Sequence, residues 1–168
     1  MINLTPTSYI VLGMLDAAGE ATPYDLKRMV AATVGNFFRL PHSQIYSEPE
    51  RLAKAGYLRE KREDSGRRRK HYSLTQKGRQ ALDEWVSTPT DELYELRDLG
   101  LLKLGFGTDP KKLAEVQLAA HKQRLAEFEE LLEQLKVAGA PEPQRLVTEA
   151  GIGHEREYVR FWSRVARR

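Results

Sequence analysis

The sequence predicts a mainly α-helical protein that contains one small β-hairpin and divides into two domains. Three observations support this prediction. Apolar residues recur at helical spacing through most of the chain. A single stretch, residues 57–74, alternates as two short strands joined by a turn would. The Ser-Thr-Pro-Thr segment at 87–90 combines a helix breaker with small polar residues, so the expected domains are residues 1–88 and 91–168.

Two helices are expected to open the first domain, and each is marked by the same pair of residues. Thr5 and Thr22 are candidate N-caps, and each is followed by a proline at the first helical position, where no amide donor is needed. The first helix is expected to end around Gly19, and the Gly-Asn pair at 35–36 ends the second.

A third helix is expected from about Pro41, with Ile45, Leu52 and Ala53 on one apolar face and polar residues elsewhere. Pro49 disturbs this pattern, because a proline inside a helix removes an amide donor and clashes with the preceding turn. Two interpretations remain open. Either the helix runs through Pro49 with a kink, or it starts late, at a capping box that begins with Ser47.

The two predicted strands, 57–62 and 70–74, flank a turn that carries three consecutive arginines, Arg67, Arg68 and Arg69. Gly56, just before the first strand, stands where a helix end favours a left-handed residue. A fourth helix is expected to begin at Thr75 and to stop before Pro89. A polar-faced helix followed by a cationic hairpin is the arrangement with which a winged helix-turn-helix binds DNA.

The second domain is expected to be entirely helical, with helices at Asp91–Phe106, from Asp109 to about Val137, and from about Gln144 to Val165. The middle helix repeats apolar residues every seven positions, which predicts a seam along another helix. The seam is too long for one short neighbouring helix to cover, so it predicts a homodimer. The candidate dimerisation residues are Leu118, Leu125, Phe128, Leu132, Leu135, Tyr158, Phe161 and Trp162.

Charge is unevenly distributed along the 168 residues, although the net charge is only +3. Residues 1–79 hold 14 Lys and Arg against 8 Asp and Glu, whereas residues 80–168 hold 13 against 16. Residues 59–79 alone hold nine basic and three acidic residues. This asymmetry indicates a first half that binds a polyanion, the alternative being an ordinary solvated surface.

Several classes of protein find no support in the sequence. Cysteine is absent, which excludes disulfides and thiolate metal sites. The four histidines are scattered, so no metal or other cofactor is predicted, and neither a phosphate-binding glycine loop nor a catalytic arrangement stands out. There is no apolar run of about 18 residues and no signal peptide at Met1–Leu4. We therefore expect a cytoplasmic protein that is neither an enzyme nor bound to a membrane.

Taken together, these segments resemble the PadR-like family of bacterial transcriptional repressors, some of which respond to phenolic acids. The resemblance is specific over about residues 5–86. A looser likeness covers 96–104, in the longer helical tail of one branch of the family. The segments that carry it are Ser8–Leu15, Pro23–Leu26, Leu40–Tyr46, Arg51-Leu52, Gly56–Leu58, Tyr72–Thr75 with Gly78, Leu96–Asp98 and Leu102–Leu104.

The resemblance implies a homodimeric repressor, held together mainly by the C-terminal helices with a contribution from the first helix, that binds a palindromic operator and is released by a small aromatic effector. Ser43 and Gln44, at the start of the third helix, are candidates to read bases, whereas Arg51 and Lys54 are expected to touch phosphate. The candidate DNA-binding residues are Ser43, Gln44, Tyr46, Ser47, Arg51, Lys54, Arg67, Arg68, Arg69 and Lys70.

Three alternatives stand beside these expectations. Tyr46 could instead pack in the domain core, while Gln44 caps a helix. The aromatic residues Trp85, Phe106, Phe128, Tyr158 and Trp162 could line an effector pocket or could form plain core and dimer seam. The whole protein could be a winged-helix module for protein–protein interaction, although a module of that kind has no need for three arginines on its hairpin.

Overall fold

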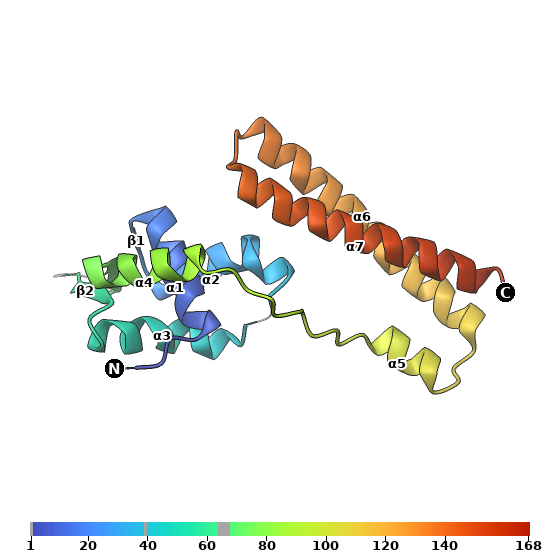
Figure 1. The fold of residues 1–168 in the computed structure, drawn as a ribbon, viewed down its shortest axis with the longest axis horizontal. Helices are drawn as coiled ribbons and strands as arrows, with labels where there is room; N and C mark the ends of the chain where they lie inside the picture. The colour runs from blue at the N-terminus through green and yellow to red at the C-terminus, as the bar shows by residue number, and fades with distance from the viewer. Residues whose placement is uncertain (1, 39, 64–67) are drawn as a thin grey trace. The chain divides into compact units, whose positions relative to one another are not determined.

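The computed structural model describes residues 2–38, 40–63 and 68–168, and the chain divides into two compact units, Met1–Glu92 and Leu93–Arg168 (Figure 1). The first unit contains the helices α1 (Pro6–Ala18), α2 (Pro23–Ala32), η1 (Val34–Asn36), α3 (His42–Lys54) and α4 (Gln76–Ser87) and the strands β1 (Glu20–Ala21), β2 (Leu58–Arg62) and β3 (Lys70–Leu74). The second unit contains α5 (Leu99–Gly105), α6 (Pro110–Val137) and α7 (Glu142–Ala166). The predicted fold class, mainly helical with a small sheet, is confirmed.

The first unit encloses one apolar core between its helices and its sheet. Both predicted helix starts are present, since Thr5 and Thr22 cap α1 and α2 and each hydroxyl accepts the amide three residues later. The stripe of α3 turns inward as expected, with Ile45 and Leu52 buried. The buried apolar residues of this core are Val11, Leu12, Leu15, Ala21, Leu26, Val30, Ile45, Leu52, Tyr57, Leu58, Tyr72 and Leu82.

The small sheet has three strands in the order β1-β3-β2, all antiparallel. The two hairpin strands occur where the sequence predicted them, and they pair in register from Leu58 opposite Leu74 to Arg62 opposite Lys70. The third strand was not predicted, because Glu20–Ala21 is too short to show any alternation. Its pairing with Ser73 and Tyr72 depends on residues about 50 positions away along the chain.

Helix α3 runs without interruption through Pro49, so the late start at Ser47 is wrong. The helix begins at His42, directly after Pro41, and Pro49 is fully buried. A proline in a helix interior costs about 3 kcal/mol. Burial of Pro49 beside Ile45 and Leu52 offsets that cost, because every apolar side chain removed from water stabilises the folded unit.

Two glycines shape the connection from α3 to the hairpin and from the hairpin to α4. Gly56 adopts φ 80°, the left-handed conformation that its position predicted. Gly78 in α4 lies against the backbone of Tyr57, and a Cβ at this position would stand 2.2 Å from the Tyr57 carbonyl oxygen. The hydroxyl of Thr75 donates to the same carbonyl oxygen at 2.9 Å, so this contact joins the start of α4 to the start of the hairpin.

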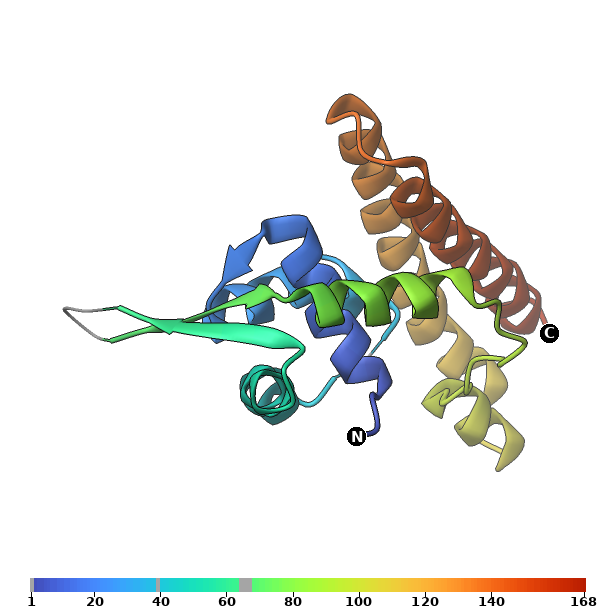
Figure 2. The same ribbon diagram turned by 60° about the vertical axis from the view of Figure 1, so that its left-hand side comes forward.

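In the second unit, α6 and α7 pack side by side along most of their length (Figures 1 and 2). Ala114 and Trp162 are fully buried between them, and a Cβ at Gly151 would meet the ring of Phe128 at 3.1 Å. α6 begins after Asp109 and ends at Val137, as predicted. In the described part of the chain, no helix carries an apolar stretch long enough to cross a membrane.

The predicted helix Asp91–Phe106 is wrong over its first half. Residues 89–98 are not helical, and α5 begins only at Leu99, where the Asp98 carboxylate accepts the amide of Leu101. Leu93 is 92% exposed and residues 91–97 are all exposed, so this segment buries no apolar stripe. A short helix without such packing is only marginally stable in water.

We expect Gly78→Ala to lower the free energy of unfolding by about 3 kcal/mol, because the new methyl group would overlap the Tyr57 carbonyl and force α4 away from the hairpin. Urea unfolding monitored by circular dichroism measures this change. Gly13→Ala in α1 is the matched control, since its Cβ meets nothing within 4 Å. Equal stability of the two variants would contradict the close approach.

Candidate nucleic-acid interface

The exposed face of α3 carries the residues that the sequence proposed for reading DNA. Ser43, Gln44 and Ser47 are exposed, and they lie in the first half of the helix. Tyr46 is 46% exposed, so it does not belong to the core of the chain as one alternative proposed. The buried stripe of α3 holds the helix on the unit and leaves these four side chains accessible.

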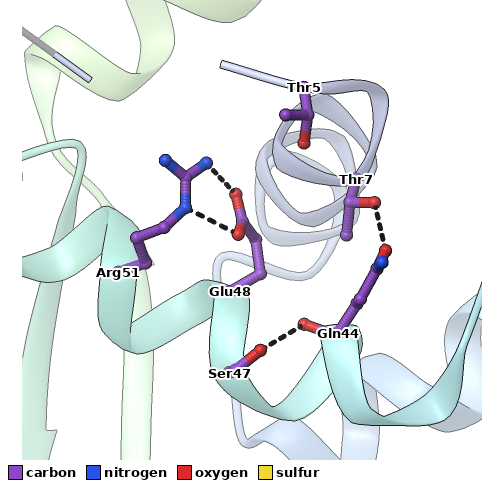
Figure 3. A pocket seen from close by; sticks show the side chains of 6 residues that line it. All are labelled: Thr5, Thr7, Gln44, Ser47, Glu48 and Arg51. Carbon is purple, nitrogen blue, oxygen red and sulfur yellow. Dashed lines mark hydrogen bonds and ion pairs between the residues drawn. The ribbon is translucent and has the colours of Figure 1, made fainter. Parts of the chain in front are cut away.

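A cluster of polar contacts joins the first half of α3 to the start of α1 (Figure 3). The hydroxyl of Thr7 donates to the Gln44 amide oxygen at 3.0 Å. One turn further along α3, the hydroxyl of Ser8 donates to Glu48 Oε1 at 2.6 Å. These contacts border a cavity of about 310 Å³ that is lined by Thr5, Thr7, Gln44, Ser47, Glu48 and Arg51. Hydroxyl, amide and guanidinium groups therefore meet at one solvent-facing site.

Arg51 belongs to this cluster and is not a free phosphate ligand. Its guanidinium donates to both oxygens of Glu48, at 2.6 and 2.8 Å, and also to Ser8 Oγ at 3.0 Å and to the Asn3 carbonyl at 3.2 Å. Four of its donor positions are thus used inside the unit. The structure indicates that Arg51 ties α3 to α1, so a contact with phosphate would require Arg51 to give up some of these partners.

Glu48 shows how strongly this cluster favours ionised groups. Burial of its carboxylate raises the pKa, but the hydrogen bonds from Arg51 and Ser8 and the charge of Arg51 outweigh burial, so the pKa lies below its ordinary value. No local sequence pattern indicated that Thr7, Ser8 or Glu48 belongs to this site. The signal for Glu48 was its position three residues before Arg51, which places the two side chains on one face of a helix.

Both candidate lysines beside α3 have acidic partners. Lys54 pairs with Glu50 at 2.9 Å, and Lys70 lies 3.4 Å from Glu50 and 3.3 Å from Glu60. The hydrogen bonds from Lys54 and Lys70 lower the pKa of the Glu50 carboxyl. The structure therefore brings Lys54 and Lys70 together around one carboxylate, where either lysine would have to leave a partner in order to reach a phosphate.

The hairpin extends away from the helices of the first unit, as Figure 2 shows. Arg67 lies outside the described residues. The side chains of Arg68 and Arg69 are exposed, and in the described ranges no carboxylate is paired with either guanidinium. His71, near the turn end of β3, lies 3.2 Å from Glu20 and 3.1 Å from Glu63. It therefore links β3 to β1 and to the residue that follows β2.

The candidate dimerisation residues lie in the second unit, where α7 already covers the predicted seam. Phe128 and Trp162 are buried within the single chain. The remaining six are partly buried along the same pair of helices: Leu118, Leu125, Leu132, Leu135, Tyr158 and Phe161. The seam therefore does not require a second chain, contrary to the argument from its length, because α7 is 25 residues long and packs along α6.

A polar and aromatic cluster that the sequence did not predict lies at the middle of α7. Glu155 is 8% exposed and accepts from His121 Nδ1 at 2.6 Å. The ring of Tyr158 lies 4.6 Å from those of both His121 and His154. Burial, followed by a hydrogen bond with Asp98, raises the pKa of Tyr158 to about 12. His121 occupies a position of the heptad seam, which was the only signal in the sequence.

The five aromatic residues that could line an effector pocket are distributed over both units. Trp162 is enclosed between α6 and α7, Phe128 packs on Gly151, and Phe106 is 85% exposed. Trp85 belongs to the first unit, where its ring stacks on Tyr9 at 4.6 Å. Tyr158 stands in a group with the rings of His121 and His154.

Known proteins share this fold and sequence pattern. Residues 11–84 match the model of the Transcriptional regulator PadR-like family. The chain is 27% identical over 140 residues to the negative transcriptional regulator PadR of Bacillus subtilis (strain 168), over 79% of this chain and 76% of the relative. Two crystal structures of Bacillus subtilis PadR are similar at 24% identity. The complex with operator DNA has a TM-score of 0.83 over 98% of both chains, and the complex with p-coumaric acid has 0.77 over 98% and 97%.

The helices α1 to α4 with the hairpin thus form a winged helix-turn-helix, followed by a helical unit. Over residues 11–84 the chain is similar to the PadR-like family of transcriptional regulators.

We expect Glu48→Gln to reduce the free energy of unfolding at pH 7 by about 1–3 kcal/mol, because a half-exposed Arg51 loses its ionic partner. The folded-state pKa of Glu48 is depressed, so its contribution is fully present above the ordinary value of 4.5 and is lost as the pH falls below it. The difference between wild type and variant should therefore shrink below pH 4.5.

Urea unfolding at a series of pH values measures this difference. Glu84→Gln, at an exposed carboxylate of α4, is the control and should show no comparable effect. A difference between wild type and Glu48→Gln that stays constant down to pH 3 would show that the ionised carboxylate contributes nothing.

Proposed function

We propose that the protein is a homodimeric, cytoplasmic transcriptional regulator that binds a specific palindromic duplex, and that it is not an enzyme. The observation that carries the proposal is the joint exposure, on one unit, of the polar first half of α3 and of Arg68 and Arg69 on the hairpin. A helix in the major groove and a cationic hairpin on the flanking backbone or minor groove are complementary to duplex DNA. The family, described as transcriptional regulators, points the same way.

Within this proposal the side chains divide into those that read bases and those that grip the backbone. Ser43 and Gln44 face base edges, and Tyr46 and Ser47 reach the sugar–phosphate backbone beside them. Arg67, Arg68 and Arg69 supply most of the attraction to phosphate, because in the described residues no carboxylate forms an ion-pair contact with the guanidinium of Arg68 or Arg69. Lys54 and Lys70 contribute less, since each is paired with Glu50.

We further propose that the regulator is a repressor that a small aromatic acid releases. The relative in Bacillus subtilis is a negative regulator, and its structure has been solved with operator DNA and with p-coumaric acid. In this chain, the group around Tyr158 offers hydrogen-bonding and aromatic side chains in the second unit. An aromatic acid needs both kinds of contact.

The exposed apolar residues of the second unit support the proposal of a homodimer. Leu93, Leu99, Leu102 and Phe106 are all more than half exposed in the single chain. A concentration of large apolar side chains in one short segment marks an interaction surface. A second copy of the chain is the partner that a palindromic duplex requires, with the two α3 helices about one duplex turn, roughly 34 Å, apart.

Replacing Arg68 and Arg69 together by alanine should weaken binding to selected and random duplexes alike. Each lost phosphate contact should lower the slope of log K against log salt by about 0.9, giving a decrease of about 1.8 for the pair. Fluorescence anisotropy over a range of salt concentrations measures the slope. Lys111→Ala with Lys122→Ala, which removes the same charge from α6, should leave the slope unchanged. An unaltered slope in the wing variant would mean that these arginines do not meet DNA.

Light scattering should give the mass of a dimer for the wild-type protein at micromolar concentration. Leu102→Ser with Phe106→Ser should shift it towards monomer, because both side chains are exposed in the single chain and their burial must come from a partner. Val137→Ser, exposed at the end of α6, is the control and should remain dimeric. A double variant that stays dimeric would place the interface elsewhere.

A further inference from the structure

The amide of Gln44 is anchored by a residue from a different helix. Gln44 is exposed in the first turn of α3, and its Oε1 accepts from the hydroxyl of Thr7 at 3.0 Å. Thr7 is 8% exposed and lies in the first turn of α1. Figure 3 shows the two side chains pointing toward each other across the space between the helices. The oxygen end of the amide is therefore directed inward.

The two helices cannot separate easily at this point. One turn along α3, Ser8 donates to Glu48, and Arg51 donates to Ser8, to Glu48 and to the Asn3 carbonyl. These charge-assisted bonds are stronger than a neutral hydrogen bond. They hold Thr7 and Gln44 at a constant separation, and so they preserve the orientation of the amide.

This orientation matters for base recognition. A free glutamine can pair with adenine by two bonds, in which Nε2 donates to N7 and Oε1 accepts from N6. With Oε1 held by Thr7, the group that Gln44 directs outward is the pair of Nε2 hydrogens. Two donors match guanine best, because O6 and N7 are neighbouring acceptors. Thymine offers only O4, adenine offers only N7 beside a conflicting amino group, and cytosine presents an amino group.

We propose that Thr7 determines the base preference of Gln44, which reads guanine as a donor instead of adenine as a donor and acceptor. Thr7 is a positioning residue in this role, because it acts through the Gln44 amide. The proposal rests on the proposed function, since it assumes that α3 faces base edges. Nothing in it requires Arg51 or Lys54 to touch DNA.

The test begins with selection of the preferred duplex by the full-length protein, followed by binding measurements at one fixed salt concentration with every base pair varied in turn. The position at which Gln44→Ala removes discrimination identifies the contact. At that position we expect wild-type protein to prefer guanine over adenine by about fivefold or more. Thr7→Val should free the amide and shift the adenine-to-guanine affinity ratio towards adenine by a similar factor.

Thr7→Ser keeps the hydroxyl and should retain the preference of the wild type, while Thr7→Ala provides a second variant without the hydroxyl in case valine disturbs the packing. Unfolding curves identify variants that no longer fold. An unchanged adenine-to-guanine ratio in folded Thr7→Val or Thr7→Ala overturns the proposal, as does a Gln44→Ala variant that flattens no position. A wild-type protein that prefers no sequence at all overturns the proposed function itself, which is a distinguishable result.

Discussion

The packing of α3 against α1 is the interaction on which the candidate interface depends. Ile45 and Leu52 anchor α3 in the core, and beside them Glu48 is buried to 8% exposure with Ser8 and Arg51 as partners. A buried carboxylate is costly unless it is fully paired, so the three groups stabilise one arrangement of the two helices and penalise others. This arrangement leaves Ser43 and Ser47 exposed to solvent, and it leaves Gln44 exposed at the border with α1, where its amide accepts from Thr7.

The positive charge of the first unit is divided between a paired set and an exposed set. Around Glu50, the lysines Lys54 and Lys70 are held by ion pairs that are partly exposed and therefore weak. On the hairpin, Arg68 and Arg69 project into solvent. On the proposed function, this division separates two tasks. The wing attracts any duplex, whereas α3 contributes hydrogen bonds that depend on the bases.

The second unit buries much of its apolar surface between its own helices, but one apolar segment remains exposed. Trp162 and Phe128 stabilise the pair α6–α7, and the contact between Gly151 and Phe128 allows the two helices to approach closely. By contrast, Leu93, Leu102 and Phe106 gain little burial within the chain. The residues that hold the helical pair together and the exposed apolar residues available to a partner are therefore different sets, whereas the heptad pattern had predicted that the helical seam itself contacts the partner.

The sequence by itself determined the features that depend on neighbours a few residues apart. The caps of α1 and α2, the left-handed Gly56, the positions of the two hairpin strands and the span of α6 could all be read from local patterns. Only the tertiary structure decided which polar groups meet. Ser8 and Glu48 are 40 residues apart, and Thr7 and Gln44 are 37 apart. Such distant contacts determine the partners of Arg51 and the pairing of β1. In the described chain, segment 89–98 is not helical because it buries no apolar stripe against distant residues. Local propensities contain no information about them, because burial and pairing exist only once the helices have packed.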